Sequence, residues 1–216
     1  MSTHFYVQMD SLKEIEAALG MARDKSRLIL KAAINNTAKQ TNRSMVKGTK
    51  RKYSYKRGAG SEDSVTNTVG DMKAANKVKK AKSGDLSASV EVKGPINELL
   101  GFHVAPALYV PGGGYPEWYK ARVLKKGRTQ KIALRPNAGG DKYKAFIIQY
   151  KSGHYALAQR IPGQRMEKDP RKEAVKSLLS ISTPKAEETV YKEEIDPDMY
   201  DILQRNIREQ IQKFLK

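Results

Sequence analysis

A long run of apolar residues at helical spacing is the strongest constraint that this sequence places on its fold. From Leu12 to Ala38 the apolar side chains recur at steps of three and four residues, which places them along one side of an α-helix. Ser11 and Glu14 fit a capping box, in which each side chain satisfies a free amide of the first helical turn. The spacing therefore predicts a long amphipathic helix over residues 11–46.

The middle of the chain predicts the sheet on which this helix packs. Residues 86–93 alternate strictly between apolar and polar side chains, the pattern of a strand with one buried face. Residues 145–150 are apolar on both faces, which is typical of a central strand, and residues 154–161 return from a turn as its partner. These patterns predict one α+β domain, residues 1–216, with a long N-terminal helix on a mostly antiparallel sheet core at 86–161.

Shorter elements are predicted around this core. An edge strand is expected at 4–9 and a polar helix near 61–72. Further short strands are expected near 100–104 and on both sides of the turn KKGR, with loops at 106–118 and 137–141.

The C-terminal segment, 162–216, is predicted to be helical. Thr183 with Pro184, and Asp196 with Pro197, suit the Ncap and N1 positions of two helices. The last helix carries an apolar stripe formed by Tyr200, Leu203, Ile207, Ile211 and Phe214.

Charge limits the partners that such a protein can have. The chain carries 41 Lys and Arg against 23 Asp and Glu, a formal net charge of +18. This excess favours nucleic acid, an anionic membrane or an acidic protein face as partner. No cysteine is present, which excludes disulfides and thiolate metal sites. Because no apolar run has the length of a membrane span or the place of a secretion signal, we expect a soluble protein made in the cytoplasm.

Two basic segments, 47–57 and 77–85, concentrate the charge and are both expected to be loops. In the first, cations alternate with Tyr53 and Tyr55, a combination that a nucleic-acid backbone contact uses. The same charges would equally suit contacts with acidic faces of partner proteins. The candidate residues of this DNA- or partner-facing surface are Lys47, Lys50, Arg51, Lys52, Lys56, Arg57, Lys77, Lys79, Lys80 and Lys82.

No arrangement of residues predicts catalysis. The glycine-rich PGGGYP lacks the Lys-Ser or Lys-Thr of a phosphate loop, and the three histidines lack metal-ligand spacing. We therefore expect no catalytic residue, no metal and no cofactor. In the stretch SGHYALAQRIPGQR, we expect His154, Arg160 and Arg165 to fix a hairpin and its Pro-Gly exit, or to meet a neighbouring subunit.

The order of these segments resembles the minor tail protein Z family of tailed phages and prophages, which is close to phage neck and tail-completion proteins. The resemblance covers nearly the whole chain, and none of its motifs is catalytic. It is strongest in KAAINNTAKQTNRSMVKGTKRKY at 31–53, in SGDLSASVEVKG at 83–94, and at 145–184, which contains KSGHYALAQRIPGQR and SLLSISTP.

The resemblance implies a structural virion protein at the head-proximal end of a long tail, which helps join tail to head and positions DNA for ejection. It implies α+β subunits in a ring, commonly of six copies, beside the tail terminator, tail tube and head–tail connector proteins. The expected location is the virion tail or neck, after assembly in the host cytoplasm and without a membrane partner. A strongly basic subunit would tolerate phage DNA in the channel without reading its bases.

Two other classes of function fit parts of the sequence. A free basic nucleic-acid-binding protein fits the charge, although the aromatic residues are few and no RNA-binding strand signature is present. Steeply salt-dependent binding by the monomer would favour that class. An enzyme would need a convergent polar pocket, which the sequence does not predict.

Overall fold

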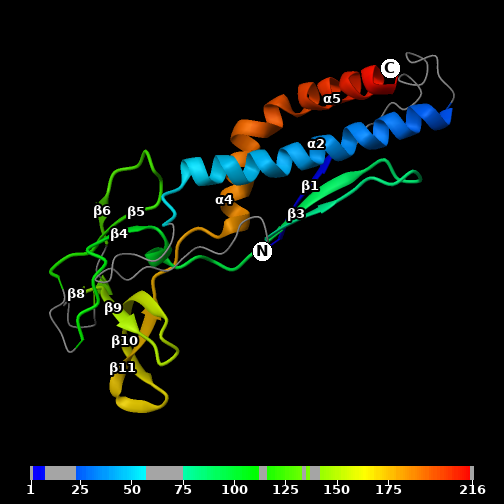
Figure 1. Cartoon of the computed structure of the whole chain (residues 1–216). Coiled ribbons are helices and arrows are strands. Elements are labelled where there is room, and N and C mark those ends of the chain that lie inside the picture. The colour runs from blue at the N-terminus through cyan, green and yellow to red at the C-terminus, as the bar shows by residue number, and fades with distance from the viewer. Residues whose placement is uncertain are drawn as a thin grey trace. The chain divides into compact units, whose positions relative to one another are not determined.

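The computed structural model describes residues 2–7, 23–56, 75–111, 116–132, 135–136 and 142–214 (Figure 1). The chain divides into two compact units. Unit 1 contains Met1–Thr49, Asp71–Pro95 and Thr183–Lys216, and unit 2 contains Lys50–Gly70 and Ile96–Ser182. Helices near both ends of the chain combine with antiparallel sheets, which confirms the predicted α+β class. The prediction treated residues 1–216 as one domain, within which the contacts gather into these two units.

Helix α2, Arg23–Lys52, supplies the longest element of unit 1 and ends in unit 2. It continues past the predicted end at residue 46, so the segment Lys47–Lys52 is helical and was wrongly predicted as loop. The helix continues because no proline interrupts it and because Gly48 costs a helix only about 1 kcal/mol relative to alanine. The positive charges of its last residues also stabilise the C-terminal end of the helix, which carries a partial negative charge. The predicted helical residues 11–22 lie outside the described part of the chain.

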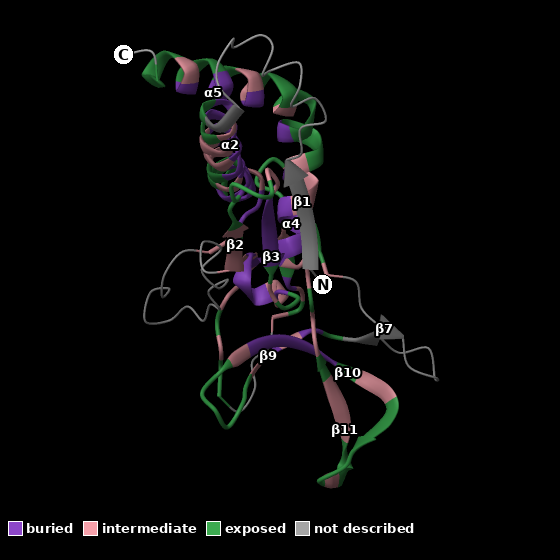
Figure 2. Cartoon of the chain, turned by 90° about the vertical axis from the view of Figure 1, so that its right-hand side faces the viewer, coloured by how far each residue is buried: buried purple, intermediate pink, exposed green. Residues whose placement is uncertain are grey.

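The buried side of α2 packs against the C-terminal helix α5, Met199–Phe214, as Figure 2 shows by the colouring of their facing sides. The amide of Asn206 donates to the hydroxyl of Thr37 at 2.9 Å, and that hydroxyl donates to the carbonyl of Ala33 at 2.9 Å. Of the predicted stripe on α5, Leu203 and Ile207 are buried and Ile211 is partly buried. Tyr200 and Phe214, at its two ends, are 71% and 47% exposed. The apolar cluster between the helices is formed by Leu30, Ala33, Ile34, Ala38, Leu203 and Ile207, with Ala81 and Ala88.

The sheet of unit 1 has three antiparallel strands in the order β1-β3-β2. Strand β1, Ser2–Val7, is the predicted edge strand, and β3, Ala88–Lys93, is the central strand, drawn in purple in Figure 2. Strand β2, Asn76–Lys79, replaces the start of the basic loop predicted at 77–85. It is a strand because β3 offers it a full ladder, in which Val78 pairs with Val90 and the lysines on either side point outward.

A short helix and a buried polar network complete unit 1. Helix α4 is Thr183–Val190 and begins at the predicted Ncap residue. A π-helical turn, Tyr191–Ile195, and a 3-10 turn, Asp196–Asp198, connect it to α5. The side-chain amide of Asn76 donates to Glu187 Oε2 at 2.6 Å and to Asn42 Oδ1 at 2.7 Å, which links β2 to α4 and to α2.

The main sheet of unit 2 has the order β11-β10-β9 and is antiparallel. The hairpin turn after β9, Phe146–Gln149, contains Gly153 at φ +82°, as predicted from the KSG turn. Two predictions were wrong here. The central strand is β10, Tyr155–Met166, and β9 lies at the edge; and β10 does not leave the sheet at Pro162–Gly163 but pairs onward with β11, Asp169–Ser177.

Strand β11 replaces the first part of the segment predicted to be helical from residue 162. Its residues DPRKEAVKS carry no clear alternation, because none of its side chains is buried and no buried face had to be encoded. The prediction missed it because pattern recognition depends on one buried face.

Short strands and a small core make up the rest of unit 2. The strands β4, His103–Ala105, β5, Lys120–Arg122, and β6, Gln130–Lys131, pair in that order, the last two around the predicted KKGR turn. A 3-10 turn, Leu99–Gly101, stands where a longer strand had been predicted. The core of this unit is formed by Leu100, Val104, Tyr119, Ala145, Ile147 and Leu157.

The predicted sheet at 86–161 is therefore divided among separate sheets. Strand β3 belongs to unit 1, and the strands after residue 96 belong to unit 2. The strands β7, Arg135–Pro136, and β8, Lys142–Tyr143, form a two-stranded ladder of their own. The turn predicted between them at 137–141, and the polar helix predicted near 61–72, lie outside the described residues.

Candidate nucleic-acid interface

Two basic segments that are far apart in the sequence meet in unit 2. The main-chain amide of Lys125 donates to the carbonyl of Lys52 at 2.9 Å, and the amide of Ser54 donates to the carbonyl of Val123 at 2.7 Å. These bonds place the last turn of α2 beside the turn that joins β5 to β6. We call the cations of the two segments the basic site, which consists of Lys50, Arg51, Lys52, Lys125, Lys126 and Arg128.

The turn in this site is tightly shaped. The amide of Gly127 donates to the carbonyl of Leu124 at 3.0 Å, which closes a turn over residues 124–127. A Cβ at Gly127 would lie 3.1 Å from that carbonyl oxygen, so the position suits glycine. The turn therefore holds the exposed Lys125, Lys126 and Arg128 on a short, defined loop.

The two tyrosines beside the basic site have a packing role. Tyr53 is 4% exposed, and the ring of Tyr55 lies 4.9 Å from that of Phe102 and 5.9 Å from that of Tyr53, measured between centroids. A buried ring cannot stack on a base. The predicted pairing of cations with base-stacking aromatics therefore does not extend to Tyr53.

Lys56 also differs from the surface cations with which it was grouped. Its main-chain amide donates to the carbonyl of Gly101 at 3.0 Å. Burial lowers the pKa of the Lys56 amine, because the charged form loses part of its hydration. Arg57, the last cation of this segment, lies outside the described residues.

The remaining predicted cations lie in unit 1. Lys47 is exposed on α2 and follows the exposed Lys39 and Arg43 at steps of four, so the three occupy one face of that helix. None of the three forms an ion pair within the part of the chain that the structure describes. The unit 1 part of α2 thus carries a basic stripe, which we define as Lys39, Arg43 and Lys47.

Lys77, Lys79, Lys80 and Lys82 are all exposed on or just after β2. Lys79 lies 3.5 Å from Glu91, whose other carboxylate oxygen is 2.9 Å from Lys93. The hydrogen bond from Lys93, followed by the charge of Lys79, lowers the pKa of Glu91. The structure thus assigns the predicted cations to two units, and it adds Lys125, Lys126 and Arg128, whose proximity to α2 the sequence did not reveal.

The residues predicted to fix the hairpin lie beside its own sheet or beside Glu98, the residue that precedes the 3-10 turn. The Nε2 atom of His154 lies 2.8 Å from Glu98 Oε2, and its ring stacks on that of Tyr150 with centroids 6.1 Å apart. The guanidinium of Arg160 lies 5.5 Å from the centre of the Phe146 ring. Arg165 pairs with Glu173 in the β10–β11 register.

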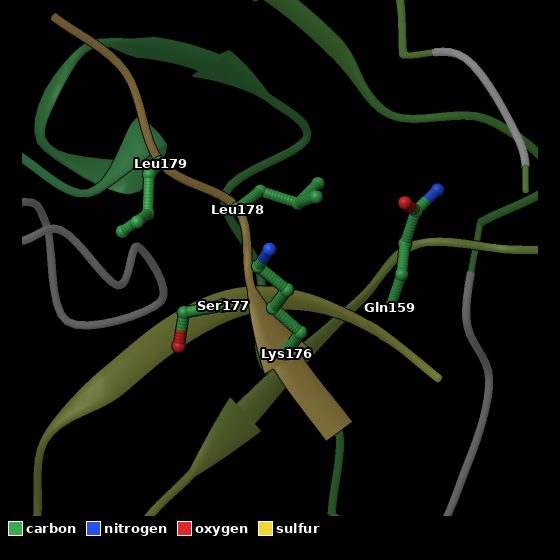
Figure 3. A pocket seen from close by; sticks show the side chains of 5 residues that line it. All are labelled: Gln159, Lys176, Ser177, Leu178 and Leu179. Atoms are coloured by element: carbon green, nitrogen blue, oxygen red, sulfur yellow. The ribbon is translucent and has the colours of Figure 1, made fainter. Parts of the chain in front are cut away.

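A small open pocket of about 240 Å³ lies beside these strands and is lined by Gln159, Lys176, Ser177, Leu178 and Leu179. Figure 3 shows Leu178 on the side of the chain that faces Gln159, and Ser177 and Leu179 on the other side, because successive side chains of an extended chain alternate. An amine, an amide and a hydroxyl line it, but no carboxylate or imidazole, so it offers no acid–base pair. Among the described residues, no group of three His, Cys, Asp or Glu side chains could hold a metal ion.

No helix within the described ranges has both the length and the apolar character needed to cross a membrane. Comparison of the chain with protein-family models, with curated proteins and with solved structures found no match. The fold and the basic site define an α+β protein whose cations gather on particular exposed segments.

Proposed function

We propose that this protein is a structural component of a tailed phage or prophage particle. In this proposal it is a minor tail or tail-completion protein of the neck, which helps join tail to head and positions DNA for ejection. The class of function rests on the segments that resemble the minor tail protein Z family. The observation that carries the DNA contact is the basic site, where two cationic segments are joined by main-chain hydrogen bonds.

The basic site suits contact with phosphates rather than with bases. Its six side chains are all cationic, and Lys50, Lys125, Lys126 and Arg128 form no side-chain ion pair with the described residues. Lysine and arginine bind the phosphate backbone through charge, and such contacts position a duplex without reading its sequence. A protein of a DNA channel needs this behaviour, because the genome must slide past the subunit.

Assembly as a ring is part of the same proposal. Repetition of the basic site around a channel would multiply its charge, and the tail terminator, tail tube and head–tail connector proteins would flank the ring. No catalytic step is proposed for the protein, and no cofactor.

The first experiment is quantitative mass spectrometry of purified particles of the phage or induced prophage that encodes the chain. A small fixed copy number, with immunogold label at the neck, is the expected result and would give the ring size. Absence of the protein from particles would overturn the structural role.

A charge-neutralised variant tests the DNA contact separately. The variant K50Q/K125Q/K126Q/R128Q is expected to assemble at the normal copy number but to deliver DNA less efficiently, because four phosphate contacts are lost. The matched control K25Q/R205Q/R208Q/K213Q removes the same charge from exposed positions of unit 1 and should deliver DNA normally. Normal infectivity of the first variant would reject the basic site as the DNA contact.

A free basic nucleic-acid-binding protein is the second candidate. The basic stripe Lys39, Arg43 and Lys47 favours it, because exposed cations on one helix face suit a phosphate backbone without any particle. The two candidates differ in where the protein is found. Crosslinking to nucleic acid in the cell, together with absence from particles, would select the second.

A further inference from the structure

The far half of the β10–β11 hairpin is a ribbon of only two strands. Strand β9 pairs with β10 from Tyr155 to Ala158 and no further. Beyond that point, β11 is the only strand that pairs with β10 among the described residues. We call residues 160–176 the distal ribbon, which extends past the end of β9 in Figure 1.

The distal ribbon buries almost nothing. None of its residues is buried, and Figure 2 colours it green and pink throughout. Met166, at the start of the tip, is 39% exposed. A two-stranded hairpin is at best marginally stable by itself, and open strand edges favour association. The ribbon therefore has the character of a segment that docks on a partner.

Bulges give the ribbon a strong twist. In the register, Arg160 pairs with Val175 but Arg165 pairs with Glu173, so β10 carries extra residues between these pairs. Gly163 in this bulge has φ +73°, and a Cβ added there would meet no atom within 4 Å. Bulges increase the right-handed twist of paired strands. A twisted, two-stranded ribbon is one of the two elements that the major groove of B-DNA admits.

Cations lie along both strands of the ribbon. Arg160 and Arg165 are on β10, and Arg171, Lys172 and Lys176 are on β11, with Lys168 at the tip. Three carboxylates accompany these six cations, and one of them, Asp169, is paired with Arg171 at 3.2 Å and Lys172 at 3.3 Å. Two rows of phosphates border a groove of DNA, and cations on both strands of the ribbon can contact both rows at once. An acidic protein face would need cations on one side of the ribbon only.

We propose that the distal ribbon enters the major groove of duplex DNA. Arg165 and Lys168 on one side and Lys176 on the other contact phosphates of the two strands, and exposed Met166 faces the groove floor. The contact is independent of base sequence, because lysine and arginine read charge along the backbone. This inference goes beyond the proposed function, since the ribbon is distinct from the basic site and its DNA contact does not require a particle.

The test is fluorescence anisotropy of the full chain with a mixed-sequence duplex and with one of its single strands, over a range of salt concentrations. The variant R165Q/K168Q/K176Q is compared with K25Q/R205Q/R208Q, which removes three exposed cations from unit 1. The ribbon variant is expected to lose about tenfold or more in duplex affinity at low salt, and its salt slope should fall by roughly two to three units. Single-strand affinity should change much less.

A second variant is expected to bind duplex DNA more tightly than the parent protein. Glu167 is exposed at the ribbon tip and forms no ion pair with the described residues. The variant E167Q removes a negative charge from beside the phosphates, so it should bind duplex roughly two- to fivefold more tightly. Melting temperature and circular dichroism of each variant confirm that the fold is unchanged, and E167Q tests the proposal even if the triple variant does not fold.

Three results would overturn the proposal. Equal losses in the ribbon variant and the unit 1 control would show that only net charge matters. Equal losses for duplex and single strand would show phosphate contact without a groove. Unchanged duplex binding, with self-association lost in sedimentation, would show that the ribbon docks on a second copy of the chain.

Discussion

Gly48 of α2 lies directly against Val190 of α4, so closely that a Cβ at position 48 would be 2.5 Å from Val190 Cγ1. The same Cβ would be 3.0 Å from Glu194 Oε2. The absence of a side chain at this one position lets the two helices approach each other inside unit 1.

Replacement of Gly48 by alanine should therefore destabilise the protein. In an exposed helix the change would stabilise by about 0.5–1 kcal/mol. Here the added methyl group overpacks the contact, and we expect a net loss of roughly 1–3 kcal/mol in the free energy of unfolding. Urea denaturation measures it. The double variant G48A/V190A should recover part of the loss, and the exposed control S44A should be neutral or slightly stabilising. A G48A protein as stable as the parent would contradict the close packing.

The buried hydrogen bond between Asn206 and Thr37 gives a second prediction. Both side chains are at most 6% exposed, and the amide nitrogen and hydroxyl oxygen are 2.9 Å apart. The variant T37V leaves a buried amide without this acceptor, so it should cost about 1–3 kcal/mol. A double-mutant cycle with N206A should show a coupling energy of about 0.5–3 kcal/mol. Additive effects of the two substitutions would mean that the bond contributes little between α2 and α5.

The elements of this fold differ in how far the sequence predicts them. Helix α2 was predictable because it buries one face, and strand β3 because its apolar and polar residues alternate, which leaves a period of 3.6 or 2 in the sequence. The single buried face expected of β3 was wrong, because its polar residues Ser89 and Glu91 are buried as well. Strand β11 was not predictable, because none of its side chains is buried and its place depends on pairing with β10. Strand β2 was not predicted either, because its exposed lysines are typical of a loop. Its Val78, between two of these lysines, pairs with Val90 of β3.

The candidate site was predictable only in part, for a related reason. The basic character of residues 50–52 is a local property of the sequence. The turn at 124–128 lies beside these residues because the amide of Lys125 donates to the carbonyl of Lys52. This contact joins positions far apart in the chain, so the sequence pattern did not predict it. The burial of Tyr53 was not predicted, because a tyrosine among lysines is typical of a surface segment. Its burial depends on packing with residues that lie far away in the sequence.

The ion pairs of Glu91 make stability depend on pH in a defined direction. The hydrogen bond from Lys93, followed by the charge of Lys79, holds the pKa of Glu91 below its value of 4.5. A carboxyl whose folded pKa is lowered adds stability above its unfolded pKa, and this contribution is lost as the pH falls through the folded pKa. The variant K93Q should therefore be less stable than the parent at neutral pH. The difference should shrink when unfolding is measured below pH 4.5, whereas a constant difference across that range would exclude this ion pair as its cause.

Gly153 and Gly84 form a matched pair for testing the turn of the β9–β10 hairpin. A Cβ would have open space at both positions, but only Gly153 has a positive φ, of +82°. An L-residue pays about 1–2 kcal/mol for the left-handed conformation, so G153A should destabilise the hairpin by roughly that amount. G84A should be neutral or stabilise slightly, because alanine restricts the unfolded chain.

Thermal unfolding of the two variants measures the difference in stability. The amide of Tyr150 donates to the carbonyl of His154 at 2.8 Å, so faster hydrogen exchange at this amide would locate the destabilisation in this hairpin. Equal melting temperatures for the two variants would mean that the turn tolerates a side chain and that φ at Gly153 is not the constraint.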